Sequence, residues 1–177
     1  KLVYNNSNFV ATYSMVADTT TDDTVQWRFI VPPAPPVWSG IAGETWSTAN
    51  SWVPGTIPAS GNKVTFNETS AANLSTTLDQ NFSLGGITVQ NPAGPVSIGG
   101  GSTLTLGSGG IDLSAASQDL TITAPVVISG AQTWPVAAGR VLEIGGVISG
   151  SGASLTKTGN GTLRLTASNT YSGGTTI

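Results

Sequence analysis

The stretch that decides the fold is Ser154-Leu-Thr-Lys-Thr-Gly-Asn-Gly-Thr-Leu-Arg-Leu-Thr-Ala-Ser-Asn-Thr-Tyr-Ser-Gly-Gly-Thr-Thr-Ile177. Within it, short alternations of apolar and polar residues are separated by Gly-Asn-Gly and Ser-Gly-Gly, which are typical of tight turns. Alternation with a period of two predicts β-strands with one buried face. Short strands separated by glycine corners predict a chain that turns and stacks as a coil of a β-solenoid, rather than pairing as hairpins.

Similar corners occur earlier in the chain. Gly85-Gly-Ile-Thr-Val89, Gly109-Gly-Ile-Asp-Leu113 and Gly145-Gly-Val-Ile148 each place a glycine pair before a strand-like run, with a spacing that suits coils of roughly 20–30 residues. We therefore predict an all-β protein in which residues 37–177 form a right-handed parallel β-helix (a β-solenoid). The handedness follows from the general preference of parallel β connections. A β-sandwich is the alternative, because it also consists of short alternating strands.

Residues 1–36 are predicted to form a separate N-terminal β-hairpin and a proline-rich linker. Alternating apolar residues over 9–15 and 25–31 predict two strands, and the polar segment 18–23 between them predicts a turn. Residues 32–36 read Pro-Pro-Ala-Pro-Pro, which is typical of a semi-rigid polyproline II linker. This linker marks the clearest domain boundary in the sequence.

The segment after the linker is rich in tryptophan. Trp38, Trp46 and Trp52 precede a Pro/Gly-rich stretch and the strand-like residues 63–66. A solenoid needs a distinct beginning, because its first coil would otherwise expose an open core and an unpaired strand edge. We therefore predict a Trp-rich N-terminal cap on the β-helix.

The composition limits the kinds of partner. Charged residues make up 8% of the chain, the net charge is −3 and there are only six Lys and Arg, so nucleic acid is an unsuitable ligand. No apolar run reaches the roughly 20 residues needed to cross a bilayer, and we expect no membrane partner. The N-terminal residues lack the pattern of a signal peptide, which suggests a piece excised from a longer secreted protein.

The chemistry of the side chains argues against catalysis. The chain has no His and no Cys, which excludes Ser-His-Asp and Cys-His arrangements and imidazole-dependent zinc sites. A glycosidase pair would have to come from acids in the solenoid, Asp79, Asp112, Asp119 and Glu143, but single acids on the outside of a coil are usually solvated.

A metal site is not expected either. Asp18, Asp22 and Asp23 could bind Ca²⁺ through oxygen atoms, but they lack the spacing of a calcium loop, and Asp is common in turns. We expect that the chain is not an enzyme, and that it has no cofactor and no metal.

The stretch from Ser154 to Ile177 closely resembles the autotransporter-associated β-strand repeat of large secreted bacterial surface proteins and multimodular enzymes. The Trp-rich opening resembles the beginning of many such repeats. This resemblance implies a bacterial protein that is secreted or lies on the cell surface. It also implies structural roles for Tyr171, in the Asn-Thr-Tyr-Ser-Gly signature, and for Trp134.

In architecture and composition the chain resembles the β-helical carbohydrate-binding modules attached to plant-cell-wall hydrolases. We therefore predict a non-catalytic module that binds a neutral plant cell-wall polysaccharide, with xylan as the expected ligand, and brings a covalently linked glycoside hydrolase to its substrate. The predicted stacking residues are Trp46, Trp52, Trp38 and Trp27, although each also suits core packing or capping. The alternative function is a structural or adhesive passenger segment of an autotransporter-like surface protein. A polysaccharide-cleaving enzyme ranks last.

Overall fold

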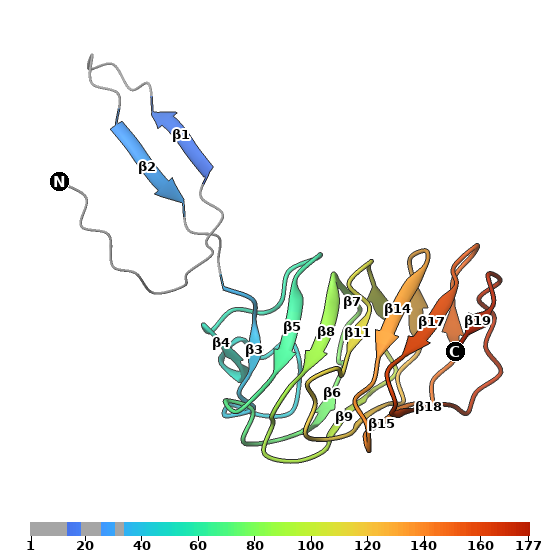
Figure 1. Cartoon of the computed structure of the whole chain (residues 1–177). Coiled ribbons are helices and arrows are strands. Elements are labelled where there is room, and N and C mark those ends of the chain that lie inside the picture. The colour runs from blue at the N-terminus through green and yellow to red at the C-terminus, as the bar shows by residue number, and fades with distance from the viewer. Residues whose placement is uncertain (1–13, 19–25, 31–33) are drawn as a thin grey trace. The chain divides into compact units, whose positions relative to one another are not determined.

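The computed structural model describes residues 14–18, 26–30 and 34–177, and the chain divides into two compact units, Lys1–Ala34 and Pro35–Ile177 (Figure 1). In the first unit β1 (Ser14–Asp18) and β2 (Gln26–Ile30) pair antiparallel. The hairpin predicted from the alternating runs is therefore confirmed. Most of the first predicted strand, residues 9–15, lies outside the described residues. β1 extends to Asp18, which was predicted to lie in the turn.

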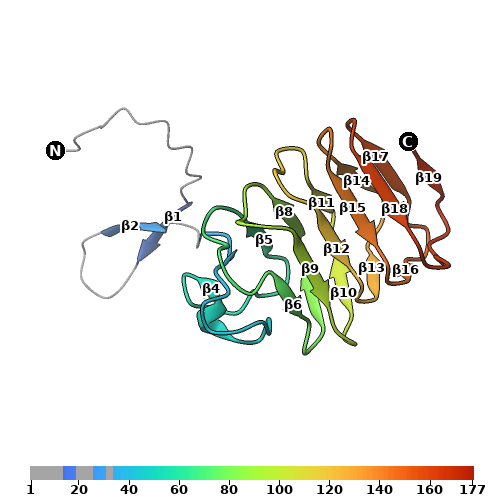
Figure 2. The same cartoon turned by 90° about the horizontal axis from the view of Figure 1, so that it is seen from below.

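The second unit consists of strands arranged on three faces, named here by their places in Figure 1. The front face holds β3 (Val37–Trp38), β5 (Lys63–Phe66), β8 (Gly86–Val89), β11 (Ile111–Asp112), β14 (Gln132–Pro135), β17 (Leu155–Thr158) and β19 (Thr175–Thr176). The lower face, seen directly in Figure 2, holds β6 (Ser75–Thr77), β9 (Val96–Gly99), β12 (Leu120–Ile122), β15 (Val141–Ile144) and β18 (Thr162–Leu165). The rear face holds β7 (Phe82–Leu84), β10 (Leu104–Leu106), β13 (Val126–Ile128) and β16 (Ile148–Ser149).

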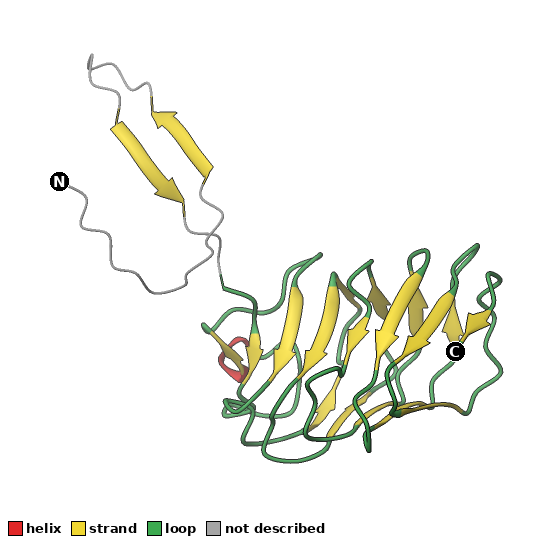
Figure 3. Cartoon of the chain, in the orientation of Figure 1, coloured by secondary structure: helices red, strands yellow, loops and turns green. Residues whose placement is uncertain are grey.

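The backbone passes from the front face to the lower face, then to the rear face, and repeats this path for about five turns. Strands of successive turns pair in parallel on every face. The predicted right-handed parallel β-helix is confirmed, and the β-sandwich alternative is wrong. Figure 3 shows one short helical turn among the described residues, η1 (Ala49–Ser51). No helix in the described part of the chain has the length and apolar character needed to cross a membrane.

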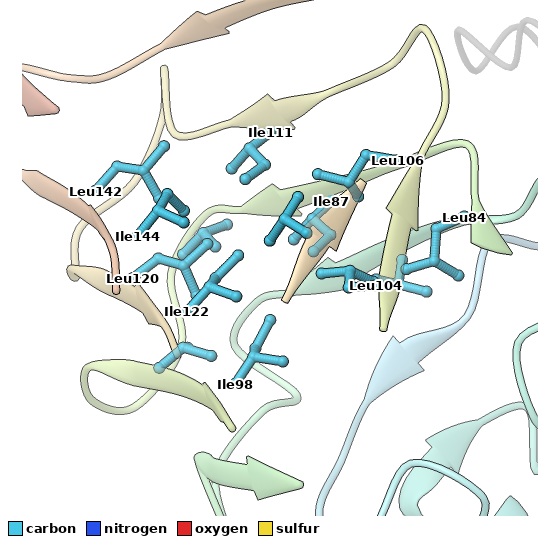
Figure 4. Close-up of a cluster of buried hydrophobic side chains, with 14 of the residues drawn as sticks. Leu84, Ile87, Ile98, Leu104, Leu106, Ile111, Leu120, Ile122, Leu142 and Ile144 are labelled. Carbon is cyan, nitrogen blue, oxygen red and sulfur yellow. The ribbon is translucent and has the colours of Figure 1, made fainter. Parts of the chain in front are cut away.

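The core consists of rows of apolar side chains that run from coil to coil (Figure 4). On the lower face Leu120 lies beside Leu142, and Ile122 lies beside Ile144. These side chains have no exposed surface, while the residues between them point outward, as the period of two predicts. Burying each such side chain stabilises the fold by roughly 1.5–3 kcal/mol, so the stacked rows supply most of the coil-to-coil stability.

Glycine is required at corners where the backbones of neighbouring coils lie close together. A Cβ atom on Gly85 would lie 2.4 Å from the carbonyl oxygen of Gly61, and one on Gly109 would lie 2.5 Å from that of Gly85. Backbones of neighbouring coils therefore touch at this corner and leave no room for a side chain. The two corners that the sequence predicted at Gly85 and Gly109 stack directly on each other.

Candidate functional site

The three tryptophans expected to stack on sugar form one cluster at the N-terminal end of the solenoid. The ring of Trp52 lies edge-on between those of Trp38 and Trp46, at centroid distances of 4.9 Å and 5.1 Å and interplanar angles of 81° and 83°. Edge-to-face packing of this kind is favourable for aromatic rings. Trp38 and Trp46 have no exposed surface and Trp52 has 1%, so the cluster is part of the core.

The polar atoms of the three indoles are also used inside the protein. The Nε1–H group of Trp46 donates to Thr76 Oγ1 at 2.9 Å, and that of Trp52 donates to the carbonyl oxygen of Trp46 at 2.9 Å. The Nε1–H group of Trp38 donates to the carbonyl oxygen of Ala72 at 3.3 Å. No indole donor of the cluster is left to bind a sugar hydroxyl.

Two phenylalanines connect the cluster to the first coil. Phe82 packs against Trp46 at a centroid distance of 5.3 Å, and Phe66 packs against Trp38 at 6.3 Å. The rings therefore close the end of the apolar core, as the predicted cap requires.

The geometry corrects the predicted sugar contacts. Trp38, Trp46 and Trp52 cannot serve as stacking platforms in the folded protein, because their faces are covered by one another and by the first coil. Trp27 lies in β2, where the side chains fall outside the described part of the structure. Sequence composition showed that aromatic residues were concentrated here but could not show that they were buried.

The cap also covers the strand edge of the first coil. β4 (Trp52–Val53) pairs antiparallel with β3, unlike the strands that join successive coils. It is only two residues long and is followed by Pro54, which has no N–H group to offer to another strand. A short edge strand that ends in proline is a common protection against unwanted pairing.

A second contact fastens the cap to the lower face. The segment before Trp46 runs alongside β6, with backbone hydrogen bonds of 2.8 Å from Thr77 N–H to the Glu44 carbonyl and 3.1 Å from Trp46 N–H to the Thr77 carbonyl. Ser47 then donates both its backbone N–H, at 3.1 Å, and its hydroxyl group to the carboxylate of Asp79. Partial burial opposes ionisation of Asp79, but the hydrogen bonds from Ser47 outweigh it and hold the pKa of this carboxyl below its ordinary value.

Trp134 occupies a comparable buried position further along the solenoid. It has no exposed surface, and its Nε1–H group donates to Gln132 Oε1 at 2.8 Å. Gln132 in turn donates to the carbonyl oxygens of Leu106 and Gly107, at 2.8 Å and 2.9 Å. The structural role predicted for Trp134 is therefore confirmed.

The acids that were considered for catalysis are held in separate local contacts. Asp119 lies 3.5 Å from Arg140, and Glu143 lies 3.2 Å from Arg164 on the next coil. Asp112 accepts hydrogen bonds from Ser114 within its own turn. Among the described residues no three acids come together as a metal-binding group. The ion pairs of Asp119 and Glu143 were not predicted, because their partners come from the following coil.

The C-terminal end of the solenoid has a different surface. Leu163, Leu165 and Tyr171 are only half-buried, and Ile177 is 93% exposed. Tyr171 packs against the core, and its hydroxyl group is hydrogen-bonded to Thr175 Oγ1. This agrees with the structural role predicted for Tyr171.

Comparison with known proteins gives one match, and it lies on this end of the chain. Residues 155–177, which contain β17, β18 and β19, match the family described as Passenger-associated-transport-repeat. This supports the resemblance of this segment to the autotransporter-associated repeat. No curated protein and no solved structure matches the chain.

Proposed function

We propose that the solenoid is a scaffold segment within the passenger of an autotransporter-like bacterial protein that is secreted or displayed on the cell surface. The observation that carries this proposal is the position of the repeat match. Residues 155–177 follow the preceding coil in register, with Leu155 beside Gln132 and Leu163 beside Leu142. The matched repeat is thus a coil of this solenoid rather than an appendage to it.

The surface of the solenoid is consistent with a scaffold. Outward positions on the lower face are mainly small and polar, such as Ser75, Ser97 and Thr121, and they lie beside one another on successive strands. The described charges are sparse, and two of the basic residues are already paired with acids of a neighbouring coil. Stability then comes from coil stacking, which suits a long passenger built of many similar units.

Two deletions of equal length would test the role of the matched repeat. The chain is placed between a secretion signal and an autotransporter β-barrel in a Gram-negative host, and its display is measured by protease digestion of whole cells. Removing residues 155–177 deletes the matched repeat. Removing residues 132–154 deletes one coil in register, since Gln132 lies beside Leu155, but keeps the repeat. We expect display to fall strongly for the first deletion and little for the second.

Equal display of the two deletion variants would contradict the proposal, because the repeat would then contribute nothing specific. Circular dichroism of both purified variants checks that each retains β structure.

Three statements remain predictions from the sequence: that the chain binds xylan, that it is linked to a glycoside hydrolase, and that it is not an enzyme. Affinity electrophoresis of the full chain in gels containing xylan tests the first of them directly. Retardation in xylan would favour the carbohydrate-binding module, with contacts other than the three buried tryptophans. Unchanged mobility in xylan and other neutral glycans would remove that alternative.

A further inference from the structure

Four asparagines in the described part of the chain begin the tripeptide Asn-x-Ser/Thr: Asn67, Asn73, Asn81 and Asn160. This tripeptide, with any residue except proline in the middle, is the acceptor motif for an N-linked sugar. The side-chain nitrogen Nδ2 of the asparagine forms the bond to the sugar. A usable site therefore needs an Nδ2 that faces solvent and has no partner in the protein.

Two of the four asparagines are poorly placed for this reaction. The Nδ2 group of Asn73 donates to the carbonyl oxygen of Gly40 at 2.6 Å, so this nitrogen faces the backbone of the cap. Asn67 is half-buried, and its Oδ1 accepts a hydrogen bond from Thr69 N–H at 2.9 Å within a tight turn.

Asn81 lies at the corner between β6 and β7, on the outside of the solenoid. Asn81 and Ser83 are exposed and flank the buried Phe82. Because alternate residues of a strand point to the same side, the amide of Asn81 and the hydroxyl group of Ser83 both point outward. Both polar residues of the motif are thus accessible in the folded protein.

The amide of Asn81 is also held in a suitable orientation. Its Oδ1 accepts a hydrogen bond at 2.8 Å from Thr103 N–H on the next coil. This contact uses the oxygen, and Nδ2 has no hydrogen-bond partner among the described residues. A sugar on Nδ2 would leave Oδ1 an acceptor, so the contact between the coils would be kept.

An acid two positions before the asparagine distinguishes Asn81 from the other three. This position is Asp79 here, whereas it is Thr65, Ala71 and Thr158 at the other sites. A carboxylate beside the acceptor offers an enzyme a charged hydrogen-bond partner, which is stronger than a neutral one. In the folded chain this carboxylate accepts two hydrogen bonds from Ser47, so an enzyme that binds Asp79 competes with the cap.

The surface beside Asn81 suits a short glycan. Thr103, Pro125 and Val147 occupy the same corner on the next three coils. Pro125 is exposed, and Val147 is 44% exposed. Neighbouring strands lie about 4.8 Å apart, so Val147 lies roughly 14 Å from Asn81. A short oligosaccharide reaches this distance, and the apolar faces of its sugar rings would cover both side chains.

We propose that Asn81 is an acceptor site for an N-linked glycan, supplied by a sugar that is activated through a diphosphate. The bond between the anomeric carbon of the sugar and the phosphate oxygen breaks, and the diphosphate leaves with the electron pair. Nδ2 of Asn81 forms the new bond to the anomeric carbon and loses one proton to a base of the transferase. Asp79 and Ser83 are the residues by which the enzyme recognises the site. The proposal does not depend on the passenger role.

Transfer to the purified, folded full chain tests this proposal. One reaction contains a bacterial transferase with a lipid-linked oligosaccharide, and the other contains a transferase with a nucleoside diphosphate sugar. Mass spectrometry of proteolytic peptides measures the occupancy of each asparagine. We expect sugar on Asn81 in one of the two reactions, which identifies the donor, and none on Asn73 in either.

Two variants test the role of the acid. Asp79→Asn should lower the initial rate of transfer to Asn81 about tenfold, because a charged partner is replaced by a neutral one. Ser47→Ala frees the carboxylate from the cap and should raise the rate. Thr158→Asp is the matched gain of function, since it places an acid two positions before Asn160 and should increase transfer there. Circular dichroism checks that each variant is folded.

A synthetic peptide of residues 77–85 serves as an unfolded acceptor with the same motif. Transfer to this peptide but not to the folded chain, or to neither, would overturn the proposal. Equal occupancy of Asn73 and Asn81 would also overturn it, because the side-chain geometry would then not select the site. An unchanged rate in Asp79→Asn would remove Asp79 from the recognised motif.

Discussion

The first and the last coil of the described solenoid differ in how their apolar side chains and strand edges are covered. Any β-helix presents an apolar core and a strand edge at each end. At the N-terminal end Trp38, Trp46 and Trp52 fill the core opening, and the antiparallel strand β4 covers the edge of β3. At the C-terminal end Leu163 and Leu165 are half-buried and β18 keeps one free edge among the described strands.

The covered first coil differs in sequence from the coils that follow, whereas the last described coil repeats their pattern. The cap contains a helical turn, an antiparallel strand and a cluster of three tryptophans, and the coils described after it are built of parallel strands instead. The final coil retains the alternation of apolar and polar residues of its predecessors, with Leu163 beside Leu142 and Leu165 beside Ile144. Terminal units with atypical sequence are a general property of repeat architectures.

The largest expected effect comes from opening the capped end. Replacing Trp52 by Ala removes the ring that lies between Trp38 and Trp46, and it should lower the free energy of unfolding by about 3–5 kcal/mol. Because contacts in a solenoid are between neighbours, unfolding should begin at this end. Denaturant unfolding measures the loss, and hydrogen exchange shows whether β3, β5 and β8 lose protection first.

Trp52→Phe is the matched control for this substitution, since it retains an aromatic ring and should lose much less stability. Uniform loss of protection along the whole solenoid would contradict an N-terminal origin of unfolding.

Two substitutions compare the last described coil with the interior of the solenoid. They replace Leu142 and Leu163, which lie beside each other on β15 and β18. Leu142→Ala removes a side chain with no exposed surface and should cost about 2–5 kcal/mol, as in other buried cores. Leu163→Ala removes its neighbour on β18, which is half-buried, and should cost about 1 kcal/mol. Denaturant unfolding of both variants measures the two losses; equal losses would mean that Leu163 is covered in solution.

The coils could be predicted from the sequence because their signals are local. The Leu-x-Leu alternation and the glycine pairs at Gly85 and Gly109 are visible within a few residues, and both fix the backbone directly. The cap was predicted because a solenoid needs a distinct beginning, and the tryptophans of that opening segment are buried. The structural role of Trp134 was implied by the resemblance to similar repeats, and its side chain is buried.

The candidate site was less predictable because it depends on contacts between distant residues. Trp46 lies against Phe82 and donates to Thr76, 30 positions away, and nothing near Trp46 in the sequence indicates that its ring is covered. Tryptophan suits both sugar stacking and core packing, so composition alone could not choose between them. Arg164 and Glu143 are 21 positions apart. Predicting their ion pair would require the exact length of the coil between them, because that length decides which residues lie beside each other on adjacent strands.

The smallest effect concerns the attachment of the cap to the first coil. The folded-state pKa of Asp79 lies below its ordinary value of 3.8, so its contribution to stability is fully present above that pH and is lost as the pH falls through the lowered pKa. Asp79→Asn and Ser47→Ala should each remove this contribution. The stability difference between the unchanged chain and either variant, measured by denaturant unfolding from pH 5 to pH 2, should therefore shrink below about pH 3.8. A difference that stays constant over this range would show that the charge of Asp79 does not hold the cap, and that the aromatic cluster alone distinguishes the closed end from the open one.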